Sequence, residues 1–138
     1  MAKKVPWKNK SPTGWWVATL IERFEFEDED RSNPRRRCRA WSNVVVLKAR
    51  DRHHAYRKAM RYGELTKGVE NDWVDVSSRR HGKLIFEGLA ILLPVYDEFD
   101  EDGCEILFED HENITVGRVQ SWVRQKPDLE VFDDTETE

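Results

Sequence analysis

The sequence predicts an α+β fold in which one helix packs on a face of a mostly antiparallel sheet. Three observations carry this prediction. Leu84 to Val95 is an apolar run interrupted only by Glu87 and Gly88, too short for a membrane span of about 20 residues but suited to a central strand. One alternating segment, one segment rich in β-branched residues and one amphipathic stretch precede it. The predicted order is β-β-α-β-β-β-α, ending in a short C-terminal helix.

The first two strands are expected to form an antiparallel hairpin. Gly14 to Phe26 alternates with period two, and Ala40 to Ala49 is rich in β-branched residues. The charged loop between them turns at Asn33-Pro34. In the first strand, one face is predicted to carry Trp16, Ala18, Leu20, Phe24 and Phe26, and the other Trp15, Val17, Thr19 and Ile21.

The stretch that follows Asp51 has the pattern of an amphipathic helix. Asp51 stands where an N-cap is expected, and Gly63 stands where a C′ glycine would end the helix. Ala55 and Ala59 lie on its apolar stripe, and two small residues allow close approach to a sheet. The sequence therefore predicts a helix that lies across one sheet face.

The rest of the chain supplies three strands and the last helix. A short strand is expected over 72–77, the long one over 84–95, and another over 104–108 after an acidic turn. Gly88 indicates a bulge, and Pro94 should loosen the pairing. Simple alternation places Leu84, Phe86, Ala90 and Leu92 on one face, and Ile85, Leu89, Ile91, Leu93 and Val95 on the other. Thr115 is expected to cap a helix that stops near Pro127 and carries Val116, Val119, Trp122 and Val123.

Charge divides the chain more sharply than its net value of −4 indicates. Residues 1–50 carry 12 Lys and Arg against 6 Asp and Glu, whereas residues 96–138 carry 3 against 15. We therefore expect a flexible basic arm over 1–13, docked in part through Trp7, a single α+β domain over 14–126 and an acidic disordered tail over 127–138.

The two cysteines and the lack of a targeting segment indicate the compartment. Cys38 and Cys104 are far apart, without CxxC spacing, and no signal peptide or transmembrane segment is visible. This usage favours two unpaired thiols, a cytoplasmic location and no membrane partner.

One set of features is spread over roughly residues 14–109: Trp15, Trp16, Val44 to Val46, Ala49, Asp51, Ala55, Ala59, Gly63, Phe86, Gly88, Gly103 and Glu105. In these features the chain resembles a family of small bacterial proteins of unknown function, the domain-of-unknown-function family catalogued as four-two-eight-eight. The chain departs from the family in its RRRCR loop and C-terminal extension. The resemblance implies a bacterial origin and supports the fold, but it implies no known activity.

The acidic turn has the spacing of a calcium loop, with Glu98, Asp100, Asp102 and Glu109 at positions 1, 3, 5 and 12 and Gly103 at position 6. Against a calcium site, position 1 is Glu, position 8 is the charged Glu105, and the flanks have the pattern of strands rather than helices. The favoured interpretation is a solvated hairpin turn with Gly103 at positive φ, so no metal and no cofactor are expected.

Catalytic motifs are sparse. Gly-rich phosphate loops, GxSxG and HExxH do not occur, and the four histidines lack ligand spacing. The sequence therefore leans away from an enzyme. A small-ligand binder or an enzyme with an unrecognised pocket between sheet and helix stays an alternative.

Two binding hypotheses remain. The first is a non-enzymatic protein-binding module, such as an immunity or antitoxin-like inhibitor with an acidic surface for a basic partner. Its candidate residues are Trp15, Trp16, Trp41, Asp97, Glu98, Asp100, Glu101 and Asp102. A homodimer is compatible with it, because a partner copy would cover exposed tryptophans. The second hypothesis is nucleic-acid binding through Arg35, Arg36, Arg37 and Arg39, although the preceding EDED favours neutralisation within the chain.

Overall fold

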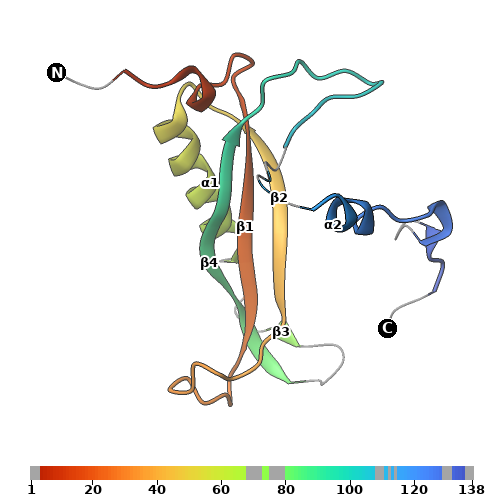
Figure 1. The fold of residues 1–138 in the computed structure, drawn as a ribbon. Coiled ribbons are helices and arrows are strands. Elements are labelled where there is room, and N and C mark those ends of the chain that lie inside the picture. The colour runs from red at the N-terminus through yellow and green to blue at the C-terminus, as the bar shows by residue number, and fades with distance from the viewer. Residues whose placement is uncertain are drawn as a thin grey trace. The chain divides into compact units, whose positions relative to one another are not determined.

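The structure is a computed structural model that describes residues 4–67, 73–74, 80–107, 111, 113, 115–128 and 132–135. The chain forms two compact units, residues 1–107 and residues 108–138 (Figure 1). In the first unit the order is η1 (Trp7–Asn9), β1 (Trp15–Phe26), β2 (Ala40–Lys48), α1 (Arg52–Lys67), β3 (Trp73–Val74) and β4 (His81–Pro94). The predicted α+β class with an antiparallel sheet is confirmed.

The sheet has the strand order β2-β1-β4-β3, and all three pairings are antiparallel. The predicted hairpin of the first two strands is present, with an unbroken register from Trp15 opposite Lys48 to Arg23 opposite Ala40. Arg36 N donates to Asn33 O at 3.2 Å, which closes the expected turn in the connecting loop. The long apolar strand pairs with β1, so it lies inside the sheet as predicted.

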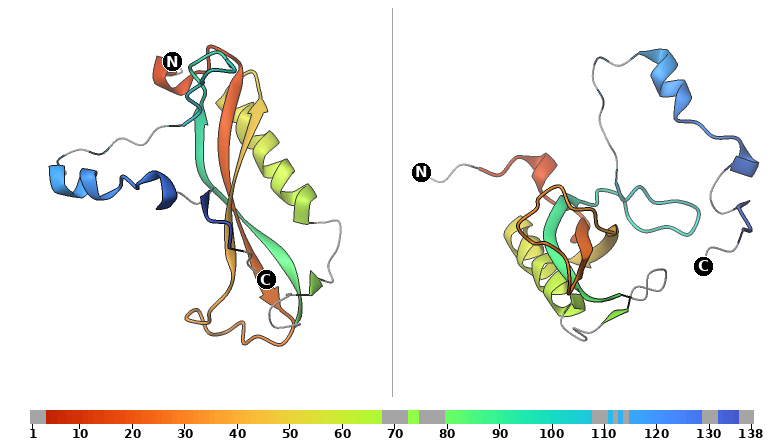
Figure 2. Two further views of the ribbon diagram at one scale, coloured as in Figure 1. Left: turned by 90° about the vertical axis from the view of Figure 1, so that its right-hand side faces the viewer. Right: turned by 90° about the horizontal axis from the view of Figure 1, so that it is seen from below.

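Helix α1 covers one face of this sheet (Figure 2). Ala55 and Ala59 are fully buried, and they pack against the face of β1 that carries Trp16, Ala18 and Leu20. His54 N donates to Asp51 Oδ1 at 2.8 Å, which confirms the predicted N-cap. The small residues let the helix approach the strands closely enough to exclude water from this core.

The predicted end of the helix is wrong, because α1 continues past Gly63 to Lys67. Gly63 lies inside the helix, where an added Cβ would stand 2.4 Å from the Phe86 ring. The glycine therefore provides space for an aromatic side chain of β4 and does not end the helix.

Two irregularities interrupt the pairing of β4 with β1. Thr19 pairs with Ile91 and the next residue, Leu20, pairs with Leu89, so Ala90 is an extra residue without a partner on β1. A second register shift leaves Glu87 as an extra residue in the same way. These bulges flank Gly88, whose φ is 138°, and they confirm the predicted irregularity. They also correct the predicted faces, because Leu89 packs with Leu92 against the helix-side core instead of on the opposite face.

The segment after β4 differs from the prediction. Residues 104–107 do not form the expected strand, and Phe108 lies outside the described residues. Of the strand expected over 72–77, the structure describes only the two residues of β3. The carbonyl oxygens of Val95 and Trp15 both accept from the Ser11 hydroxyl, at 3.2 and 2.6 Å, so the end of the basic arm lies against the sheet.

The second unit contains α2 (Val116–Ser121) and η2 (Lys126–Asp128). Arg118 N donates to Thr115 Oγ1 at 3.2 Å, which confirms the predicted cap of the last helix. Among the residues described, we find no helix long and apolar enough to cross a membrane.

Candidate protein-binding surface

The face of the sheet opposite α1 carries a stripe of apolar side chains. Residues paired across neighbouring strands project to the same face, so Val46, Val17 and Leu93 form one row. Val44, Thr19 and Ile91 form the next row. Val17 is fully buried, whereas Val44 is 53% exposed and Val46 is 44% exposed. The β2 end of both rows is therefore open to water.

Strand β2 also lies at an edge of the sheet. Phe24 N donates to Arg39 O and Ala49 N donates to Gly14 O, both at 2.9 Å. The backbone groups of the odd-numbered residues from 39 to 49 therefore form their hydrogen bonds with β1. The backbone N–H and C=O groups of Ser42, Val44 and Val46 consequently point away from β1. Within the described ranges, no strand pairs with this side of β2.

The three candidate tryptophans do not share one surface. Trp15 is half-buried and packs edge-on against Phe99 with ring centroids 5.1 Å apart. Trp16 is only 2% exposed, lies beneath α1 and donates through Nε1 to Ala49 O at 3.1 Å. Trp41 pairs with Glu22 on the α1 side of the sheet. Trp16 is buried, so it is no longer a candidate contact residue. Trp41 lies on the α1 side of the sheet, so Trp15 is the one of the three that lies beside the apolar stripe.

The predicted acidic residues lie in an exposed turn after β4, at the end of the sheet where β1 begins (Figure 1). We call residues 97–102 the acidic loop. Gly103 N donates to Asp100 O at 3.2 Å and Gly103 has a φ of 153°, in agreement with a solvated turn at positive φ. The predicted hairpin is wrong, because residues 104–107 do not form a strand. All five carboxylates are exposed: Asp97, Glu98, Asp100, Glu101 and Asp102. Phe99 fastens the loop to Trp15, so these charges lie beside the apolar stripe.

The calcium alternative gains no support from the described residues. They contain no group of three or more His, Cys, Asp or Glu side chains arranged to hold a metal ion. Glu109, the proposed twelfth ligand, lies outside the described residues.

The acidic loop acts on the thiol next to it. Desolvation, followed by the nearby carboxylates of Asp97 and Asp100, raises the pKa of Cys104. Cys38 is exposed, and neither cysteine forms a disulfide. The expectation of two unpaired thiols is confirmed.

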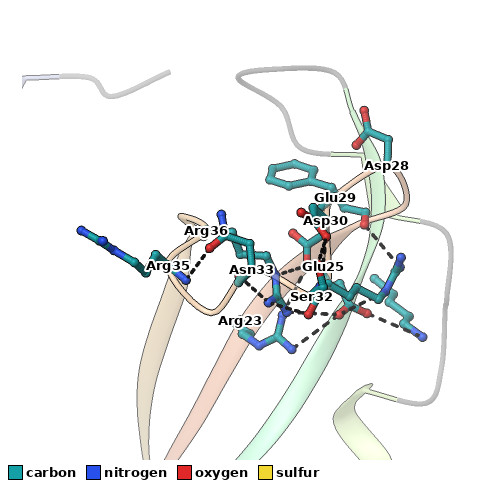
Figure 3. Close-up of polar contacts among 12 residues, drawn as sticks. Arg23, Glu25, Asp28, Glu29, Asp30, Ser32, Asn33, Arg35 and Arg36 are labelled. Atoms are coloured by element: carbon teal, nitrogen blue, oxygen red, sulfur yellow. Dashed lines mark hydrogen bonds and ion pairs between the residues drawn. The ribbon is translucent and has the colours of Figure 1, made fainter.

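The opposite end of the sheet carries a network of charged side chains around Arg23 (Figure 3). Arg23 lies 3.5 Å from Glu25, 3.7 Å from Glu29 and 3.3 Å from Glu87. Arg36 adds a contact of 3.1 Å to Glu29, whose side chain is only 6% exposed. The loop between β1 and β2 is therefore folded onto the end of β1 by ion pairs, as the EDED sequence led us to expect.

This network divides the four arginines of the nucleic-acid hypothesis. Arg36 also donates to the carbonyl oxygens of Arg31 and Asn33, at 3.2 and 2.9 Å, so it is committed to the loop. Arg35 and Arg37 are exposed, and the Arg39 guanidinium lies 5.5 Å from the centre of the Trp41 ring. We call the exposed residues Arg35, Arg37 and Arg39 the basic loop.

A shallow depression at the start of α1 is the described hollow nearest to the predicted pocket between sheet and helix. It is lined in part by Asn9, Trp16, Arg52 and His53. Nearby, Arg50 N donates to His54 Nδ1 at 3.1 Å. Desolvation and the neighbouring cations lower the pKa of His54. These contacts keep the imidazole as an acceptor for the backbone, which is a structural role.

Comparison with known proteins found no matching family model, no similar curated protein and no similar solved structure. The resemblance to the domain-of-unknown-function family therefore stays a prediction.

Proposed function

We propose that this chain is a protein-binding module whose contact surface is the open side of β2 together with the acidic loop. The observation that carries the proposal is the exposure of Val44 and Val46 on an edge strand, on the face that α1 does not cover. Exposed β-branched side chains beside unpaired backbone groups favour the addition of a strand from another protein.

The charge beside this surface indicates the kind of partner. Five exposed carboxylates of the acidic loop lie at the Trp15 end of the stripe. They favour a partner segment with lysine or arginine, because complementary charge speeds association and orients the segment. A bacterial, cytoplasmic origin and an inhibitor role against a basic protein are part of this proposal.

Affinity capture from cells of the source organism tests the proposal. We expect basic proteins to be retained by the wild-type chain and released by Val44→Lys/Val46→Lys, with retention falling as salt rises. Asn43→Lys, on the same strand but on the α1 side of the sheet, is the matched control and should retain them. Equal retention by the wild type and the double variant would refute the proposed surface.

Nucleic-acid binding stays as a second candidate because the basic loop is exposed. It predicts retention on heparin at physiological salt that is lost in Arg35→Ala/Arg37→Ala. Arg36→Ala is no test of it, because Arg36 holds the loop to Glu29.

A further inference from the structure

The two edges of the sheet are protected very differently from pairing with another chain. Beyond β4, the described residues of β3 cover Gly82 and His81, and β4 itself is bent by two bulges in its pairing with β1 and ends at Pro94. Strand β2 pairs with β1 without a register shift and contains no proline. The charged residue of this strand, Lys48, stands at its last position. A regular, apolar edge of this kind is stable in solution when another strand covers it.

From this difference we infer that β2 pairs with β2 of a second copy of the chain, antiparallel across a twofold axis. The inference rests on the proposed function, since it names the partner of the same strand. Because Ser42, Val44 and Val46 direct their backbone groups outward, the best register places Val44 opposite Val44 and Ser42 opposite Val46. This register places Ala40 opposite Lys48, whose carbonyl oxygen already accepts from Lys58 Nζ, so the central pairs from Ser42 to Val46 carry the ladder.

The charges at the two ends of the strand favour a second copy. The acidic loop lies near the Lys48 end of β2, and the basic loop leads into its Ala40 end (Figure 1). Antiparallel pairing therefore brings the acidic loop of each copy to the end where the other copy carries Arg37 and Arg39. A twofold axis repeats this attraction at both ends of the interface.

The valines add burial to this pairing. A twofold axis perpendicular to the sheet keeps the open faces on one side, so Val44 and Val46 of both copies form one continuous stripe. Pairing removes apolar surface of these side chains from water along the seam between the two copies, which favours the dimer.

Sedimentation of the full chain tests the inference through its mass. We expect a dimer for the wild type and a monomer for Val44→Pro, because proline removes an N–H that points away from β1. Val44→Thr keeps the N–H and the β-branched shape, so it should stay dimeric. Circular dichroism of Val44→Pro should match that of the wild type. If the variant unfolds, a monomeric wild type still refutes the inference.

A charge exchange gives a second, independent readout. One variant carries Asp100→Lys/Glu101→Lys/Asp102→Lys, and the other carries Arg35→Glu/Arg37→Glu/Arg39→Glu. Each alone places like charges at both ends of the dimer, whereas their mixture restores attraction at both ends. Native mass spectrometry should therefore show at least tenfold more mixed dimer than either homodimer. A statistical mixture would overturn the inference.

The outcomes separate this inference from the proposed function. A monomeric wild type that still captures a basic protein through Val44 and Val46 removes only the second copy as partner. A monomer that captures nothing removes both.

Discussion

At the residue scale, Arg23 is the point on which carboxylates from three parts of the chain converge, two of them nearly buried and the third, Glu87, exposed. Glu25 follows it on β1, Glu29 comes from the loop, and Glu87 is the extra residue of a bulge in β4. The sequence indicates that EDED is neutralised within the chain, but it does not indicate Arg23, because Glu87 is 64 positions away. By contrast, the caps at Asp51 and Thr115 were predictable, since each depends on a residue three positions further on.

Arg23→Met is expected to lower the free energy of unfolding by about 1–2 kcal/mol. It removes one of the two arginines that Glu25 and Glu29 share, whereas Arg36 stays 3.9 Å from Glu25 and 3.1 Å from Glu29. Urea denaturation measures the change. Arg35→Met is the control, and it should change stability by less than about 0.5 kcal/mol because Arg35 is exposed. Equal midpoints for the two variants would show that the network is not structural.

Asp51 should make part of the helix stability depend on pH. The backbone N–H of His54 donates to this carboxylate and lowers its pKa. The stabilisation is therefore fully present above the ordinary carboxyl pKa of about 3.9 and is lost as pH falls through the lowered value. At neutral pH, the midpoint temperature of thermal unfolding should be higher for the wild type than for Asp51→Ala. The difference should vanish in acid. Asp51→Asn keeps an acceptor and should lose that pH dependence.

Cys104 is expected to react more slowly with iodoacetamide than Cys38 at neutral pH, because its raised pKa keeps the thiol protonated. Mass spectrometry of a Cys38→Ser chain measures the rate at Cys104. Asp97→Asn/Asp100→Asn removes two of the charges that raise the pKa, so it should speed alkylation. An unchanged rate would contradict this electrostatic effect.

At the scale of elements, the limits of prediction lie where two segments meet. Gly63 has the sequence pattern of a helix end, yet the Phe86 ring against it explains why that position is glycine. Alternation along β4 predicts Leu89 on the wrong face, because a bulge at Ala90 shifts the register. Gly88 marks the irregularity in the sequence, but the number of extra residues depends on β1, the strand beside it.

Gly63→Ala should destabilise the protein by about 1–3 kcal/mol, because the new Cβ clashes with the Phe86 ring. This opposes the gain of about 1 kcal/mol that alanine gives in an exposed helix. Gly117→Ala in α2 meets no neighbouring atom and should not lower the urea midpoint. Adding Phe86→Leu should recover part of the loss, and strict additivity of the two changes would argue against the clash.

At the scale of the whole molecule, the α+β class was predictable because period-two and helical patterns are strong in this chain. The free edge was not predictable, because it depends on the strand order. In the order β2-β1-β4-β3, β1 pairs with β4 on its other side, so β2 stays at the edge of the sheet. The candidate surface accordingly shifted from tryptophans to Val44 and Val46. Its acidic part was predictable, because a run of carboxylates beside a glycine stays in water wherever the strands lie.

The two extra residues of β4 have a consequence for assembly. A chain without Glu87 and Ala90 would keep every core side chain on its present face, because each bulge adds one residue to an otherwise regular alternation. Such a chain would, however, have a straight β4, with β3 and Pro94 as the remaining features of that edge. If β2 pairs as we infer, a straight second edge would favour the joining of further copies side to side without closing, as in a fibre. The two insertions thus oppose open-ended polymerisation of the inferred pair.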